Sequence, residues 1–124
     1  MSTVPDLSAY GIDTAAGLRQ LDFDAALYTR FLAAFSQEDS ALRLQNALAR
    51  GDAKAAFECA HELKGLAAQL GLALLARHAS ALCAALRDSS APDALSRAQA
   101  LLPSLLRAHG LTLRGIALIN APES

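Results

Sequence analysis

A stripe of small and branched apolar residues between residues 53 and 70 constrains the fold of this chain more than any other feature. Its members recur at spacings of four, three, four and three, the pattern of a helix that packs inside a bundle. They are Ala56, Ala60, Leu63, Ala67 and Leu70. Because alanine and leucine dominate the whole chain and β-branched residues are scarce, the remaining sequence favours the same all-α class.

Helix-breaking and helix-capping residues divide the 124 residues into successive helical segments. Gly51 suits the left-handed position after a helix and Asp52 suits the cap of the next one, whereas Gly71 breaks or bends the chain again. Pro103 is expected to kink or end the last segment, because proline lacks the N–H of a helical hydrogen bond. Helices are expected over about residues 13–19, 24–35, 39–50, 53–70, 72–87 and 93–109.

The segments form one domain with an irregular lead-in. Ser36 and Asp39 have the spacing of a capping box before the third helix. The helical bundle is predicted to occupy residues 8–107, and residues 108–124 form a C-terminal helix extension or tail. That tail is apolar, and the sequence leaves open whether it packs on the bundle or binds a partner.

Composition excludes several classes of function. The formal net charge is −1 without a basic stripe, which argues against nucleic acid as a partner. No apolar run reaches the roughly 18–20 residues of a membrane span, and the first residues lack the order of a signal peptide. Cys59 and Cys83 are too few for a disulfide framework and are expected to be reduced thiols near the core. We therefore expect a cytoplasmic monomer that is not associated with membranes.

No metal site is expected in this chain. The spacing of Cys59, His61, His78 and Cys83 does not match a structural zinc pattern. A glycine-rich phosphate loop, a nucleophile elbow and a paired-carboxylate signature are also missing from the sequence.

His61 lies beside the apolar stripe and is predicted to point away from the core. Lys64 follows at plus three, Gly65 at plus four and Ala68 at plus seven, so all three share its side of the helix. A neutral imidazole is a nucleophile at cellular pH, and a lysine offers positive charge to phosphoryl oxygens. Glycine inside a helix costs roughly 0.5–1 kcal/mol relative to alanine, which indicates that another protein approaches here. Each residue taken singly is also compatible with a solvated surface or with helix packing.

This arrangement resembles the histidine-containing phosphotransfer (HPt) family. The resemblance covers about residues 8–107, and it implies an elongated helical bundle with an antiparallel four-helix core plus short N-terminal helices. The residues that carry it are His61, Lys64, Gly65, Ala60 before the histidine, Gly51-Asp52 ahead of its helix and Leu70-Gly71 behind it.

The resemblance implies a phosphorelay carrier rather than an enzyme. His61 would accept a phosphoryl group from the aspartyl phosphate of one receiver domain and pass it to another, with Lys64 assisting the phosphate and Gly65 permitting close docking. The implied partners are response-regulator receivers and a hybrid sensor histidine kinase of two-component signal transduction. No cofactor is expected on this chain, and the Mg²⁺ of the reaction is expected in the receiver.

The chain departs from the family at two places. Glu62 follows the histidine, where many members have serine or threonine. On the next helix many members offer a glutamine or glutamate to the histidine ring, and here Cys83 or Ser80 takes that position. Which residue fixes the orientation of the His61 ring is therefore open.

Docking is expected to use the surface around His61. The predicted contact residues are Phe57, Glu62, Ala68 and Gln69, together with parts of the second helix near Leu21 and Phe23. Phe57 is equally compatible with the core, and the core is the favoured place for Phe23.

A second class of function remains open from the sequence. The same bundle could bind a receiver or a sensor kinase as a scaffold or inhibitor without carrying phosphate. A retained His61, Lys64 and Gly65 favours the carrier, because a scaffold has no need of a nucleophile. A phosphatase is the least favoured, since Gln69 is the sole candidate to orient water.

Overall fold

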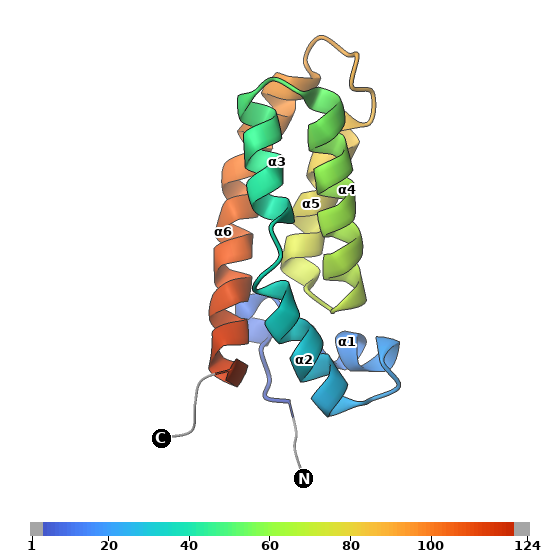
Figure 1. Ribbon diagram of the computed structural model, residues 1–124, viewed down its shortest axis with the longest axis vertical. Helices are drawn as coiled ribbons and strands as arrows, with labels where there is room; N and C mark the ends of the chain where they lie inside the picture. Colours follow the sequence, from blue (N-terminus) through green and yellow to red (C-terminus); the bar gives the residue numbers. More distant parts are fainter. Residues whose placement is uncertain (1–3, 121–124) are drawn as a thin grey trace.

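The computed structural model describes residues 4–120 as six α-helices and one short 3₁₀ helix. Helices α3 to α6 run antiparallel side by side, and α1, α2 and η1 gather at one end of this bundle (Figure 1). The predicted all-α class with an elongated four-helix core is confirmed. The elements are η1 (Ser8–Tyr10), α1 (Thr14–Gln20), α2 (Ala25–Phe35), α3 (Ser40–Ala49), α4 (Ala53–Gln69), α5 (Ala73–Leu86) and α6 (Ala94–Asn120).

Aspartate caps start three of the helices. The side chains of Asp13, Asp24 and Asp52 each accept a hydrogen bond at 3.0 Å from the backbone N–H three residues further on. These bonds satisfy donors that the first helical turn leaves free. Gly51 has φ +74°, the left-handed conformation predicted for the residue before Asp52.

The capping box predicted before α3 is wrong. The Ser36 hydroxyl donates to the carbonyl of Ala33 at 2.6 Å, back into α2. Asp39 stands at the start of α3, but its side chain makes no capping hydrogen bond there. Its carboxylate instead accepts from Nε of Arg43 at 2.8 Å, since a guanidinium is a stronger partner than a backbone amide.

Of the two effects predicted for Pro103, an end of the helix is wrong, because α6 runs through it to Asn120. Pro103 and Gln99 are both exposed, so the Gln99 carbonyl that proline leaves without a donor is open to water. Beyond Gly110 the helix stays packed, with Thr112 and Ile116 buried. The domain boundary predicted between residues 107 and 108 falls inside α6 and stays a prediction.

The last turns of α6 pack on the N-terminal lead-in. A Cβ atom at Gly115 would lie 2.7 Å from Cβ of Tyr10, so only glycine allows this contact. Ile119 is half-buried against the core and Leu118 is 55% exposed. Of the two possibilities for the tail, packing on the bundle therefore describes residues 108–119.

The turn between α4 and α5 is held by the N-terminal helices. The Tyr28 hydroxyl donates to the Leu70 carbonyl at 2.7 Å, and the Asp13 N–H donates to the Gly71 carbonyl at 2.7 Å. Gly71 has φ +72°, and a Cβ atom there would collide with the Asp13 carbonyl. A Cβ atom at Gly17 would in turn collide with the Tyr28 ring. This end of the bundle is therefore closely interlocked.

Replacing Tyr28 with phenylalanine should lower the free energy of unfolding by about 1–3 kcal/mol, because the buried Leu70 carbonyl would lose its donor. Urea unfolding measures this change. Tyr10→Phe is the matched control, since the Tyr10 hydroxyl makes no hydrogen bond to any other residue between 4 and 120. Equal stabilities of the two variants would contradict the role given to the Tyr28 hydroxyl.

Stability should also fall in mild acid because of His109. Its ring lies edge-on against Phe35 at 6.2 Å, and burial lowers the pKa of His109 from its ordinary value of 6.5. The folded protein binds this proton less readily than the unfolded chain, so the stabilisation is complete above pH 6.5 and is lost as the pH falls below that value. Urea unfolding at about pH 8 and about pH 5 should show a smaller loss for His109→Leu than for the wild type. An equal loss in both proteins would exclude His109 as the cause.

Candidate functional site

Helix α4 presents His61 on the side opposite its buried stripe. Ala56, Ala60, Leu63 and Ala67 are each no more than 1% exposed, as the sequence predicted, whereas His61 is exposed. At 100° per residue, the imidazole lies about 130° around the helix from the mean direction of this stripe. The ring is therefore directed to solvent and is open to another molecule.

The surface of α4 next to His61 carries only very short side chains. Gly65 and Ala68, one and two turns further along α4, are both exposed. A Cβ atom at Gly65 would meet nothing within 4 Å, and the residue has no left-handed backbone. Neither packing nor conformation of the described chain requires glycine there, although glycine weakens a helix. The surface of α4 at Gly65 is therefore open to the approach of another molecule.

Two side chains of α4 flank the imidazole. The Phe57 ring is half-buried and lies 5.8 Å from the His61 ring, centre to centre, with a tilt of 35°. Lys64 is half-buried toward α5, where its charge opposes the rise in the pKa of Cys83 that burial causes. No carboxylate in residues 4–120 forms an ion pair with Lys64, so its ammonium group is available to an anion.

The residues predicted to support the ring from α5 lie below the surface. Cys83 is 3% exposed and Ser80 is half-buried. Neither makes a hydrogen bond to His61 within the described chain, and burial raises the pKa of the Cys83 thiol. Phe57 is the side chain that contacts the ring instead.

An apolar groove of about 250 Å³ runs between α2 and α4. Leu66 and Gln69 line it from α4, five and eight residues beyond His61, or roughly 7 and 12 Å along the helix axis. Gln69 is one of the predicted docking residues. From α2 the lining residues are Phe31, which is 40% exposed, Ala34 and Phe35, and Glu38 and Leu70 complete the groove.

Leu21 and Phe23 do not line the groove, and their predicted docking role stays a prediction. The core position favoured for Phe23 is wrong. Phe23 is 68% exposed with φ +61°, because it lies in the tight turn between α1 and α2. Phe31 lies about 60–70° around the helix from the mean direction of the buried seam of Tyr28, Leu32 and Phe35, at the edge of that seam.

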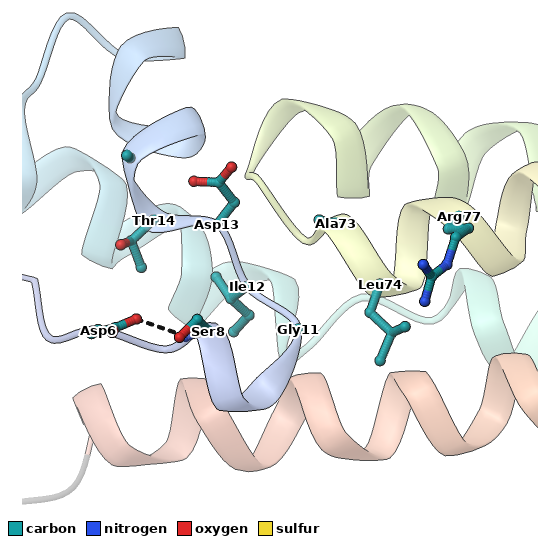
Figure 2. Close-up of a pocket in the computed structure, with 10 residues that line it drawn as sticks. Asp6, Ser8, Gly11, Ile12, Asp13, Thr14, Ala73, Leu74 and Arg77 are labelled. Atoms are coloured by element: carbon teal, nitrogen blue, oxygen red, sulfur yellow. Dashed lines mark hydrogen bonds between the residues drawn. The ribbon is translucent and has the colours of Figure 1, made fainter.

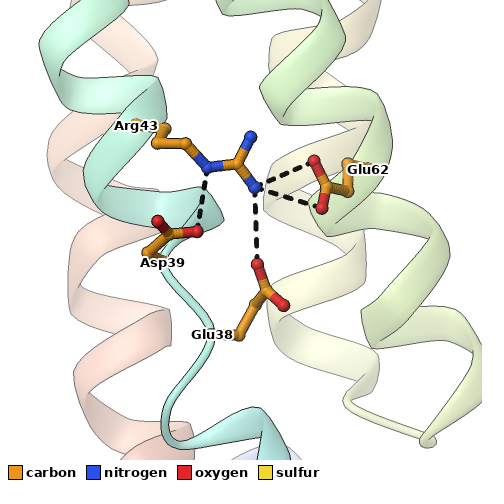
Figure 3. A network of polar contacts seen from close by, with 4 residues as sticks. All are labelled: Glu38, Asp39, Arg43 and Glu62. Atoms are coloured by element: carbon orange, nitrogen blue, oxygen red, sulfur yellow. Dashed lines mark hydrogen bonds and ion pairs between the residues drawn. The ribbon is translucent and has the colours of Figure 1, made fainter.

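A network of charges lies on the α3 side of the site (Figure 3). Nη2 of Arg43 donates to both carboxylate oxygens of Glu62, at 3.1 and 3.0 Å, and so joins α3 to α4. The same guanidinium contacts Asp39 at 2.8 Å through Nε and Glu38 at 3.4 Å through Nη2. The sequence carried one signal for this network, the spacing of four between Asp39 and Arg43. The sequence carried no signal for the contact between Arg43 and Glu62, which lie 19 residues apart.

A second hollow, larger than the groove, is separate from His61. It measures about 560 Å³ and lies between the lead-in and the start of α5 (Figure 2). Asp6, Asp13 and Arg77 are its charged lining residues, and no residue of the predicted site borders it. Within residues 4–120 there is also no group of three or more histidine, cysteine or acidic side chains that could hold a metal ion. No helix in that range is both long and apolar enough to cross a bilayer.

One protein family matches this chain. The model of the Hpt domain family covers residues 30–111, which are 82 of the 124 residues and include His61, Lys64 and Gly65. The matched range holds α3, α4, α5 and the N-terminal part of α6. No curated protein and no solved structure matches the chain.

Two glycine substitutions should distinguish a glycine that the fold requires from one that it does not. Gly65→Ala should raise the free energy of unfolding by about 0.5–1 kcal/mol, since the added methyl group enters open space within a helix. Gly17→Ala should lower it, because the methyl group would meet the Tyr28 ring and the Leu70 carbonyl at 2.4 and 2.6 Å. Thermal and urea unfolding check both. A destabilised Gly65→Ala protein would mean that the fold itself needs this glycine.

Proposed function

Because this chain belongs to the Hpt domain family of histidine phosphotransfer modules, we propose that His61 is the residue that carries the phosphoryl group. The observation that supports this most is the open surface around an exposed imidazole. His61 is exposed and faces a glycine that the fold does not require, whereas His78 and His109 are half-buried. Of the three histidines, His61 alone lies where a second protein can bring a phosphoryl group to the ring.

The proposed reaction is a reversible transfer between an aspartyl phosphate and His61. A ring nitrogen of His61 attacks phosphorus, an N–P bond forms, and the bond from phosphorus to the aspartyl oxygen breaks. The receiver regains its carboxylate, and the proton of the other ring nitrogen leaves to water. The reverse of these steps on a second receiver passes the group on. The chain is thus a carrier rather than an enzyme in its own right.

Lys64 is proposed to stabilise the transferring group. Its ammonium lies one turn from the histidine and has no ion-pair partner in the described chain, so it can approach the phosphoryl oxygens. A point charge of this kind is most useful where negative charge builds up in the transition state. Phe57 contacts the imidazole and limits the orientations that the ring adopts.

The receiver is proposed to supply the metal. A Mg²⁺ ion held there would neutralise phosphoryl oxygens during the transfer, and we propose no cofactor on this chain. A hybrid sensor histidine kinase is the proposed source of the phosphoryl group. This arrangement suits a cytoplasmic, monomeric carrier.

Docking is proposed to combine the low surface of α4 with the apolar groove beside it. Gly65 and Ala68 let the partner backbone come close to His61, and Phe31 with Leu66 offers apolar area a turn or two away. Exposed apolar residues that line a groove are typical of sites where another protein binds. Glu62 and Gln69 border this surface and are proposed to contact the receiver at its edge. The same surface would also serve a scaffold that binds receivers without accepting phosphate.

Incubation with a phosphorylated receiver and Mg²⁺ tests the carrier. Wild type should gain an acid-labile, alkali-stable phosphate, followed by mass spectrometry, and His61→Gln should gain none because the nucleophile is missing. His78→Gln is the matched control and should be phosphorylated as well as wild type. Receiver binding without any transfer would instead support the scaffold, and phosphate retained by His61→Gln would place the acceptor elsewhere.

A further inference from the structure

Glu62 creates a charge problem for a phosphorylated His61. It follows the histidine directly, and neighbours in a helix lie 100° apart, which puts the two side-chain ends roughly 8–10 Å from each other. Phosphorylation turns a neutral ring into a group with about two negative charges at neutral pH. A carboxylate at that distance disfavours the product, and a glutamate side chain is flexible enough to move closer.

Arg43 can both hold the Glu62 side chain in place and offset its negative charge. Its Nη2 atom contacts the two oxygens of Glu62 at 3.1 and 3.0 Å, which draws the carboxylate toward α3 (Figure 3). The guanidinium is itself held by Asp39 and Glu38, so it cannot easily leave Glu62. Its positive charge also offsets part of the negative charge that the three carboxylates bring to this edge.

We propose that Arg43 is a positioning residue for phosphotransfer, acting through Glu62. It holds the Glu62 carboxylate on the α3 side and neutralises it, so that phosphohistidine forms at His61 without repulsion from its sequence neighbour. The proposal rests on the proposed function of His61. Lys64 and Glu58 also lie near the ring on α4, but neither forms an ion pair within the described chain, so Arg43 is the residue that controls a neighbouring charge.

A small phosphodonor tests the proposal without any receiver. Phosphoramidate donates its phosphoryl group to imidazole: the P–N bond of the donor breaks, an N–P bond to the ring forms, and ammonia leaves with the ring proton as ammonium. The rate of phosphohistidine formation at His61 is followed by phosphorus NMR and intact-protein mass spectrometry. The variants compared are Arg43→Gln, Glu62→Gln, the double variant of both, Arg43→Lys and the control Arg50→Gln.

If charge repulsion is the cause, the variants should form phosphohistidine at His61 with a distinctive pattern of rates. Arg43→Gln should be about threefold slower than wild type at about 10 mM ionic strength and equal to it at about 1 M, where the Debye length is only about 3 Å. Glu62→Gln and the double variant should match wild type or exceed it, because the carboxylate is gone. Arg43→Lys should recover most of the rate. Arg50→Gln, which loses a surface arginine paired with Asp52 at 3.9 Å, should be unchanged.

The contrary results are equally distinct. If the ion pair is only structural, the double variant and Glu62→Gln should be as slow as Arg43→Gln, which would overturn the proposal. Equal rates for Arg43→Gln and wild type at low salt would overturn it too and would leave the carrier function standing. If phosphoramidate phosphorylates no variant at His61, wild type included, the proposed function fails and this proposal fails with it. Circular dichroism of each variant confirms that the rates are compared between folded proteins.

Discussion

The turn at Leu70 and Gly71 is the constraint on which the rest of the structure depends. Its two carbonyl groups accept hydrogen bonds from Tyr28 and Asp13, so three segments of the chain meet at one point. Gly71 is required twice over, by its positive φ and by the closeness of the Asp13 carbonyl. The turn fixes where α4 ends, and packing of the alanine stripe in the core leaves His61 facing solvent.

The sequence predicts the parts of this fold that depend on local chemistry. The four-three spacing of apolar residues identified the buried side of α4, and the Asp52 cap marked where α4 begins. Both signals lie within one or two helical turns, so a single stretch of chain contains them. His61 could be placed on the outer face for the same reason.

Competition for a carboxylate, solvent exposure and helix–helix contacts explain what the sequence did not predict. Ser36 and Asp39 have the spacing of a capping box, but the Asp39 carboxylate accepts a hydrogen bond from Arg43 instead. Pro103 was expected to interrupt α6, yet its exposed position removes the need for a buried hydrogen-bond donor. The groove between α2 and α4 depends on how two helices meet, and periodicity in either helix alone does not show that.

The glycines fall into those that the packing of the chain requires and those that it does not. Gly17, Gly71 and Gly115 lie where a Cβ atom would collide with the chain itself, so the fold accounts for them. Gly65 lies in open space inside a helix, where alanine would be more stable. Gly110 in α6 likewise has open space around it, so what distinguishes Gly65 is its place beside the exposed His61. Its position one turn from His61 is what connects the stability of α4 with the chemistry proposed on its surface.

The small residues of the α4 stripe also make the charge network possible. Alanines at the contact let α3 and α4 pack closely, because short side chains reduce the distance between helix axes. Only at close approach does a side chain from α3 reach the outer flank of α4, as Arg43 does when it contacts Glu62. The buried side of α4 thereby determines which charges surround its exposed side. We expect a larger residue in the stripe to push the two helices apart and to weaken the contact between Arg43 and Glu62, the residue next to His61.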